Sequence, residues 1–254
     1  MGFKKFSSWL EALQNEGTEH LPSEERRRFL KMGFLVTGVF ASGSLLSLVS
    51  KVNKVYGAPE VYRRSYPYRP HYSMVLKIDQ CVDCERCKEA CAKTNHVPSY
   101  GWRTNILERR IPVAPDEYVT EFIPVLCNHC NVPPCVRVCP TKATYKDKKT
   151  GIVIMNYKKC IGCKTCMEAC PYNARYFNEE KRAIDKCNFC YDTRLSKGEK
   201  LTACAAACPA GVRIFGDLSN PESQVYQMVH NPERVVWVLR PGAGAKPNVF
   251  YTKG

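Results

Sequence analysis

Sixteen cysteines carry the chemistry that this sequence can perform, and their spacing divides them into four groups. The first and third groups share the spacing C-x2-C-x2-C-x3-C, whereas the second is C-x2-C-x4-C-x3-C and the fourth is C-x2-C-x13-C-x3-C. In chain order the groups are Cys81, Cys84, Cys87 and Cys91; Cys127, Cys130, Cys135 and Cys139; Cys160, Cys163, Cys166 and Cys170; and Cys187, Cys190, Cys204 and Cys208. No cysteine lies outside these groups.

Cysteines at this spacing are typical ligands of cubane [4Fe-4S] clusters. Three closely spaced thiolates let a short loop curl around one face of a cluster and point its backbone N–H groups at the sulfides. The fourth cysteine points away from that loop, and in two-cluster ferredoxins it binds the other cluster. We therefore predict that all sixteen cysteines bind iron and that they hold four [4Fe-4S] clusters.

The residue after the last cysteine decides how the chain leaves each site. Proline stands there in three groups, at Pro140, Pro171 and Pro209, where it removes an N–H group and restricts the backbone. The first group has Ala92 instead, which is a departure from the pattern.

Zinc and disulfide bonds are the alternative uses of these cysteines. Zinc sites use two C-x2-C pairs per ion and have no need for a third cysteine two residues further on. Disulfides are open to a protein that is exported from the cytoplasm. A metal and sulfide assay separates the three cases, since only the clusters contain iron and acid-labile sulfide.

The net charge of +14 does not by itself indicate nucleic-acid binding. An oxidised cluster with its four thiolates carries about −2, so four clusters would leave roughly +6. No basic stripe with interleaved aromatic residues is present, and we expect no nucleic-acid partner.

The first part of the chain has the features of an export signal. Residues 25–31 (Glu-Arg-Arg-Arg-Phe-Leu-Lys) resemble the twin-arginine motif, and residues 32–50 carry no charge. We expect export by the twin-arginine route to the periplasmic face of the cytoplasmic membrane. A cleavage site at residues 55–57 is poor, so we favour retention of residues 32–50 as a single transmembrane anchor. Before the arginines, apolar residues at helical spacing fit an amphipathic helix, or the segment is a disordered extension: Phe3, Phe6, Trp9, Leu10 and Leu13.

An internal repeat indicates the fold. Residues 74–78 lead into Cys81 as residues 153–157 lead into Cys160, and the tripeptide Glu-Ala-Cys recurs at Cys91 and Cys170. Each unit is expected to be a short strand, a cluster loop and a short helix, which is half of a ferredoxin. The predicted fold class is α+β, with two nested two-cluster ferredoxin-like modules behind the twin-arginine leader.

The predicted organisation follows the cysteine groups. Its parts are a cytoplasmic segment (1–31), the leader or anchor (32–50), a proline-containing linker (51–72), an outer module (73–126 and 180–216), an inner module (127–179) and a tail (217–254). In the tail we expect a strand at residues 235–239 and a turn at residues 241–244. The tail either covers the modules or contacts another subunit.

From Ser73 onward the chain resembles the four-cluster iron-sulfur subunits of the dimethyl-sulfoxide reductase, polysulfide reductase and formate dehydrogenase type. The motifs behind this resemblance are Cys127-Asn128-His129-Cys130, Pro133-Pro134-Cys135, Cys139-Pro140-Thr141-Lys142-Ala143, Cys170-Pro171-Tyr172-Asn173-Ala174-Arg175-Tyr176 and Phe215-Gly216-Asp217-Leu218. It is most similar to exported forms that pair with polytopic, quinone-reactive membrane subunits.

The resemblance implies that each cluster takes three cysteines from one group and the fourth from another. Quartet I would be Cys81, Cys84, Cys87 and Cys208; quartet II Cys187, Cys190, Cys204 and Cys91; quartet III Cys127, Cys130, Cys135 and Cys170; and quartet IV Cys160, Cys163, Cys166 and Cys139. Every position is filled, which suggests four cubanes.

The resemblance also implies a function. The chain would be a non-catalytic electron-transfer subunit of a membrane-bound respiratory complex, and we favour sulfur-compound metabolism. Its partners would be a quinone-reactive integral membrane subunit and a catalytic or multihaem cytochrome c subunit. A free periplasmic ferredoxin-like carrier or a stand-alone redox enzyme is the alternative. No nucleophile, nucleotide-binding loop or haem motif is present. His129 and the lysines before cluster loops, Lys158, Lys159 and Lys186, either tune a cluster or have no redox role.

Overall fold

The computed structural model describes residues 66–254. The predicted cytoplasmic segment, the leader and most of the linker lie outside the described residues. Within residues 66–254, none of the helices has both the length and the apolar character needed to cross a membrane.

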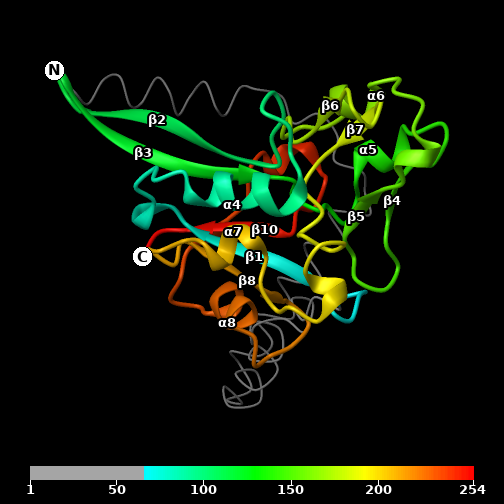
Figure 1. The fold of residues 1–254 in the computed structure, drawn as a ribbon. Coiled ribbons are helices and arrows are strands. Elements are labelled where there is room, and N and C mark those ends of the chain that lie inside the picture. The colour runs from blue at the N-terminus through cyan, green and yellow to red at the C-terminus, as the bar shows by residue number, and fades with distance from the viewer. Residues whose placement is uncertain (1–65) are drawn as a thin grey trace, which may run out of the picture. The chain divides into compact units, whose positions relative to one another are not determined.

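A four-stranded sheet joins the two ends of the described chain (Figure 1). Its strand order is β8-β1-β10-β9, and the strands are β1 (Tyr72–Lys77), β8 (Arg213–Asp217), β9 (Val236–Trp237) and β10 (Val249–Thr252). Strand β1 is antiparallel to β8 and parallel to β10, so that Met74 pairs with Phe215 on one side and with Val249 on the other. Mixed helix and strand content was expected, and this sheet with its helices confirms it.

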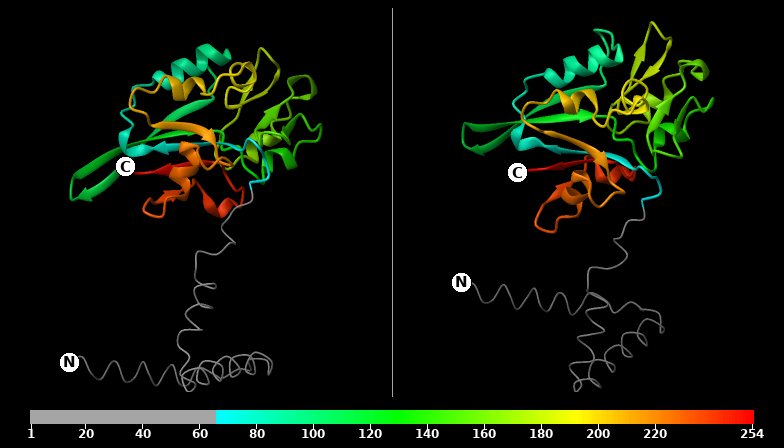
Figure 2. Two further views of the ribbon diagram at one scale, coloured as in Figure 1. Left: turned by 90° about the horizontal axis from the view of Figure 1, so that it is seen from below. Right: turned by 60° about the horizontal axis from the view of Figure 1, so that its bottom comes forward.

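Side chains of the sheet alternate between two cores, as the two-residue period of a strand requires. Met74 and Leu76 belong to the core that contains cluster-group cysteines, whereas Val75 belongs to a second core with Phe250 and Val225. Helices α4 (Arg86–Asn95) and α7 (Ala203–Ala206) cover the first face, and α8 (Gln224–His230) covers the second (Figure 2). The sheet therefore provides the rigid support for the cysteine loops on one face only.

The cysteine groups in the middle of the chain lie on loops and short helices next to two small hairpins, beside this sheet (Figure 1). These elements are α5 (Pro134–Arg137), β4 (Thr144–Lys146), β5 (Val153–Met155), α6 (Thr165–Glu168), β6 (Tyr176–Asn178) and β7 (Ala183–Asp185). Their apolar core is small and includes Cys135 and Cys166 beside Val153 and Ile184. Such a core contains few large side chains, and cysteines of the second and third groups form part of it.

The predicted repeat is present in the backbone. A 3-10 turn precedes each of the two equally spaced groups, η2 (Ile78–Gln80) and η3 (Tyr157–Lys159). The residue before the following helix is left-handed in both, with φ 57° at Glu85 and 61° at Lys164. Strand, cluster loop and helix thus follow each other as expected. The helices differ in length, because α4 has 10 residues and α6 has 4.

A long hairpin was not predicted. Strands β2 (Thr104–Ala114) and β3 (Glu117–Leu126) pair over almost their whole length and project from the body in Figure 1. The turn places Asp116 at φ 64°, and the register shifts between Pro112 and Ala114. The root of the hairpin at Leu126 leads directly into the second cysteine group.

Both boundaries of the predicted outer module differ from the structure. His71 is buried and its backbone N–H donates to Asp217 Oδ1 over 2.7 Å, so residues 66–72 pack on the folded body although they were expected in the linker. The tail supplies α8, β9, η5 (Pro241–Ala243) and β10. It therefore covers the sheet and completes it. The expected strand at residues 235–239 is the shorter β9.

Candidate iron-sulfur sites

The four cysteine groups have similar positions relative to the helices, turns and strands. Each group begins directly after β3, η2 or η3, or one residue after β7, and its third cysteine lies on a helix. These third cysteines are Cys87 on α4, Cys135 on α5, Cys166 on α6 and Cys204 on α7. The fourth group includes the turn η4 (Leu195–Lys197) inside its long gap. All sixteen cysteines are free of disulfide bonds.

One cavity is lined by the four cysteines of quartet I. Cys81, Cys84 and Cys87 come from the first group, and Cys208 joins them from the fourth. Apolar residues such as Ile106 complete the wall, and Arg213 is the basic side chain in it. Four thiols around one cavity match the ligand set of a cubane.

A second cavity is lined by the four cysteines of quartet III. Cys127, Cys130 and Cys135 meet Cys170 of the third group there, together with Arg175. Two of the four predicted quartets thus line one cavity each. In the described part of the chain, no group of three or more His, Cys, Asp or Glu residues is arranged to hold a single metal ion.

In quartets II and IV, cysteines of the same quartet act electrostatically on one another. Burial, and then the charges of Cys91, Cys204 and Cys190, raise the pKa of Cys187 well above its ordinary value. These are the other three members of quartet II. In quartet IV, Cys139 is one of the charges that act on Cys163 and on Cys166.

Several buried thiols hold their protons more tightly than a free cysteine does. Burial and neighbouring cysteines raise the pKa of Cys91 and of Cys130 to about 12. Thiols with such pKa values hold their protons at neutral pH, and only a bound cation can replace those protons. The donor set therefore fits a metal cluster that binds with release of protons.

Buried cations surround the cysteines. Arg175, Lys186 and Arg213 are buried, and none of them forms an ion pair with a carboxylate of residues 66–254. Arg213 faces the thiols of Cys204 and Cys87. Arg175 Nη1 lies 3.5 Å from Cys166 Sγ. A buried charge is costly unless it is compensated, and anionic clusters at the quartets would compensate these three.

Electrostatic neighbours link each quartet to another. The charge of Cys204 acts on Cys87, that of Cys127 acts on Cys187, and that of Cys135 acts on Cys166. These pairs connect quartet I to II, II to III and III to IV. All cysteines of quartet II are buried, whereas quartets I and IV each contain an exposed one, Cys84 or Cys163.

The histidine and lysines that the sequence singled out have different environments. His129 is buried and stacks on Phe189 with ring centres 3.8 Å apart, and its Nδ1 accepts the backbone N–H of Val153 over 3.1 Å. Burial lowers the pKa of His129 well below its ordinary value, so the ring is neutral. Lys186 is buried and donates to the carbonyl oxygen of Cys187 over 2.7 Å. Lys158 and Lys159 are exposed.

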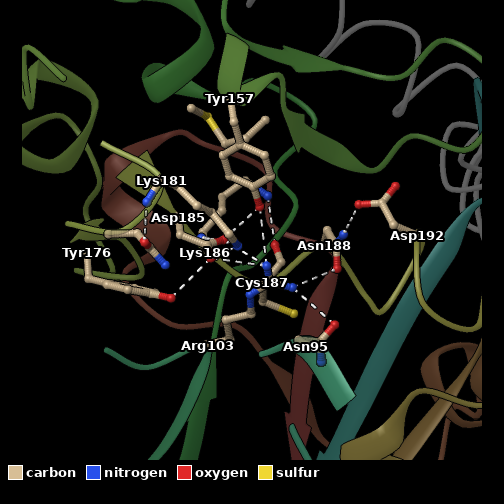
Figure 3. Close-up of polar contacts among 12 residues, drawn as sticks. Asn95, Arg103, Tyr157, Tyr176, Lys181, Asp185, Lys186, Cys187, Asn188 and Asp192 are labelled. Atoms are coloured by element: carbon tan, nitrogen blue, oxygen red, sulfur yellow. Dashed lines mark hydrogen bonds and ion pairs between the residues drawn. The ribbon is translucent and has the colours of Figure 1, made fainter. Parts of the chain in front are cut away.

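A polar network beside quartet II was not predicted from the sequence (Figure 3). Arg103 and Asp185 form its centre, with Nη2 of the arginine 2.9 Å and 3.1 Å from the two carboxylate oxygens. Asn95 at the end of α4 connects Arg103 to the cysteines. Single polar residues at large sequence separation carry no motif. The nearest signal in the sequence is Ala92, because the missing proline lets α4 continue to Asn95.

Comparison with known proteins agrees with this geometry. Residues 118–218 match the family described as "4Fe-4S dicluster domain". The matched region contains the second, third and fourth cysteine groups. Together with the cysteine-lined cavities, this match defines the chain as an iron-sulfur protein of the ferredoxin-like class.

Three relatives narrow the class. The B subunit of tetrathionate reductase from Salmonella typhimurium is 37% identical, over 89% of this chain and 87% of its own length. The B component of polysulfide reductase from Wolinella succinogenes is 38% identical over 70% and 92%, respectively. The Hdr-like menaquinol oxidoreductase iron-sulfur subunit 1 of Archaeoglobus fulgidus is 34% identical over 90% and 97%. This protein belongs to the same family of ferredoxin-like, electron-transferring iron-sulfur subunits of redox complexes, as its motifs predicted.

Proposed function

We propose that this protein binds four [4Fe-4S] clusters, one on each of quartets I to IV, and transfers electrons along them in that order. The observation that carries this proposal is the pair of cavities, each lined by four cysteines from two distant groups. When bound, the clusters supply one-electron redox chemistry. The protein supplies the ligands, the buried positive charge and the separation from water.

The two ends of the proposed series are where partners would exchange electrons. Quartets I and IV each have a water-exposed cysteine, while quartet II is buried. Electron transfer weakens steeply with distance, so a partner needs access to an end site. A series with two accessible ends suits a subunit that lies between two partners better than a free carrier, which needs only one.

We further propose that one partner is a quinone-reactive membrane subunit and the other is a catalytic or cytochrome subunit, on the periplasmic face of the membrane. The names of the relatives support this, since two are subunits of tetrathionate and polysulfide reductases and one belongs to a menaquinol oxidoreductase. The motif at residues 25–31 supports export by the twin-arginine route. Sulfur compounds are the favoured substrates of the complex.

The cluster assignment is tested with serine variants chosen across the groups. The full chain is purified anaerobically, and iron, sulfide, zinc and the EPR spectrum are measured. Wild type should contain about sixteen irons, four per cubane. Cys84→Ser and Cys208→Ser should alter the same EPR signal, and Cys170→Ser should alter a different one. Zinc without iron, or different signals for Cys84→Ser and Cys208→Ser, would refute the assignment.

The partner assignment has its own test. An affinity tag on the chain should recover a stable membrane complex from detergent-solubilised membranes, with at least one integral membrane subunit and one further redox subunit. Recovery of the chain alone, from the soluble periplasmic fraction, would support the free carrier instead.

A further inference from the structure

The side chain of Asn95 lies against two cysteines that belong to different groups. Its amide nitrogen Nδ2 is 3.4 Å from Cys190 Sγ and 3.6 Å from Cys91 Sγ. Nδ2 also donates to the carbonyl oxygen of Cys91 over 3.0 Å, which holds the amide against its own helix. Asn95 is buried, so water does not compete for these contacts.

Asn95 reaches the sulfurs because α4 does not end at the last cysteine of its group. Ala92 keeps its backbone N–H, and the helix continues to Asn95, four residues after Cys91. In the other three groups proline follows the last cysteine. The residues at the position equivalent to Asn95 there are Ala143, Ala174 and Val212, whose side chains have no hydrogen-bond donor.

Two donors fix the orientation of the amide. Asn95 Oδ1 accepts Arg103 Nη1 over 3.1 Å and Thr193 Oγ1 over 3.1 Å. With the oxygen engaged by two donors, the nitrogen must face Cys190 and Cys91. The amide therefore presents N–H groups, and not its carbonyl oxygen, to the thiolates.

Arg103 is itself held by a buried carboxylate (Figure 3). Asp185 binds Arg103 Nη2 through both oxygens and also accepts the hydroxyls of Tyr157, over 3.0 Å, and Tyr176, over 3.1 Å. Lys181 Nζ lies 3.0 Å from the same carboxylate. Arg103 Nη1 also donates to Asn188 Oδ1 over 3.3 Å, so the guanidinium that orients Asn95 is held on several sides.

We propose that Asn95, positioned by Arg103 and Asp185, raises the reduction potential of the cluster on quartet II relative to a site without this amide. Reduction adds one negative charge to the cluster and its thiolates. N–H groups that bind the thiolate sulfurs stabilise the more negative state, and burial strengthens the effect. This role rests on the proposed cluster at quartet II and adds a determinant that lies outside the cysteine motifs.

The test is a potentiometric titration of the full chain followed by EPR, with Asn95→Leu against wild type. The variant keeps a similar volume and loses the donor. We expect the oxidised-to-reduced ratio of the quartet II cluster to rise about tenfold at fixed potential. For a one-electron couple this is a shift of the midpoint potential by about 59 mV to a lower value. Asn95→Asp should shift the same cluster further, since it also adds negative charge. The other three clusters should keep their midpoints.

A milder variant and a matched control keep the test decisive if Asn95→Leu loses its cluster. Thr193→Val removes one of the two bonds that orient the amide and should give a smaller shift in the same direction. Asn178→Leu changes a buried asparagine whose Oδ1 accepts the backbone N–H of Lys181, and it should shift no cluster.

The outcomes separate this inference from the proposed function. Four clusters with unchanged midpoints in Asn95→Asp and Thr193→Val would overturn the role of Asn95 and leave the clusters in place. Shifts equal to those of Asn178→Leu would also overturn it. The proposed function itself would be refuted if the wild-type chain has no cluster on quartet II. In that case the iron content would be low and Cys190→Ser would have the same EPR signals as wild type.

Discussion

The first and third cysteine groups have identical spacing and nearly identical loops, yet the chain leaves them differently. Cys91 lies inside the 10-residue helix α4, whereas the 4-residue helix α6 ends at Glu168, before Cys170. Two features accompany the difference: Ala92 allows a helical Cys91, whereas Pro171 disfavours a helical conformation of Cys170 and Asn173 has a left-handed φ of 47°. One helical turn is therefore enough to place cluster ligands, and the extra turns of α4 serve something beyond ligation.

The longer helix α4 makes contacts with a cysteine site, and the shorter helix α6 cannot make equivalent contacts. Asn95 and its partner Arg103 lie beside quartet II, where all cysteines are buried. After the shorter helix, an arginine takes the nearby position instead. Arg175 stands five residues after Cys170, as Arg213 stands five residues after Cys208. The repeated unit thus keeps its loop and varies the group that follows it.

The largest effect is expected when the first group is given the proline that follows the last cysteine of the third group, in the variant Ala92→Pro. Proline inside α4 removes a helix hydrogen bond and clashes with the preceding turn, at a cost of about 3 kcal/mol or more. We expect loss of about four irons and a clear fall in melting temperature, measured by iron assay and circular dichroism. Asn95→Leu serves as control, since it leaves the helix backbone intact. Retention of all iron in Ala92→Pro would show that Cys91 does not need the helix.

Replacement of each of the two equivalent arginines, Arg213 and Arg175, tests whether they act on separate sites. Arg213→Met and Arg175→Met remove a buried positive charge from the cavities of quartets I and III, respectively. Contacts between charged groups and thiolates are worth about 1.5–3 kcal/mol, so Arg213→Met should lower the reduction equilibrium of the quartet I cluster about tenfold to hundredfold. Arg175→Met should do the same at quartet III and also affect quartet IV, because Arg175 Nη1 lies 3.5 Å from Cys166 Sγ. EPR titration measures this, with Arg213→Lys and Arg175→Lys as charge-preserving controls. If either variant shifted the midpoints of the clusters on quartets I and III together, the two arginines would not act on separate sites.

The two repeats also share an exposed apolar residue after their first cysteine. Val82 is 68% exposed and Ile161 is 66% exposed, each beside a quartet that has a water-exposed cysteine. If partners dock at both ends, Val82→Glu and Ile161→Glu should each slow electron exchange with a different partner by roughly tenfold, as loss of an interface contact does. Stopped-flow reduction by each partner measures the rates. Stability should change by less than about 0.5 kcal/mol, and equal slowing with both partners would argue against two ends.

The smallest effect is expected for the reverse exchange, Pro171→Ala. Removal of proline adds freedom to the unfolded chain and should cost about 0.4–1 kcal/mol. Helix α6 should not lengthen, because Asn173 has a left-handed φ of 47°. Iron content and all midpoints should equal those of wild type, and helix content from circular dichroism checks the backbone. A longer helix would show that Pro171 alone sets the end of α6.

The sequence predicted the repeated features best. The similar approaches to Cys81 and Cys160 predicted strand, loop and helix, because local geometry around a metal cluster leaves little freedom. Regular cysteine spacing predicted the ligands, and this remains a prediction. The resemblance predicted quartets whose members line the two cavities. Spacing alone did not order the quartets, since that order depends on contacts between distant segments.

Hairpin β2–β3 and the network around Arg103 were not predictable in the same way. Pro112 and Pro124 lie within the two strands of the hairpin, and proline is a signal against a strand interior. Much of β2 is exposed on both faces, so no clean alternation of apolar and polar residues marks it. Arg103, Asn95 and Asp185 meet only in the folded chain, and a single buried polar residue looks like a surface residue in a sequence.

The parallel pairing of β1 with β10 has a consequence for biosynthesis. Met74 finds its partner Val249 only when nearly the whole chain has left the ribosome, and quartet I likewise waits for Cys208. Pairings of such high sequence separation form late, because a long loop must close first. Quartets III and IV draw only on residues 127–170 and can fill earlier. Cofactor insertion should therefore run from the middle of the polypeptide outward, and a chain truncated between Cys170 and Cys187 should accumulate as a half-loaded intermediate.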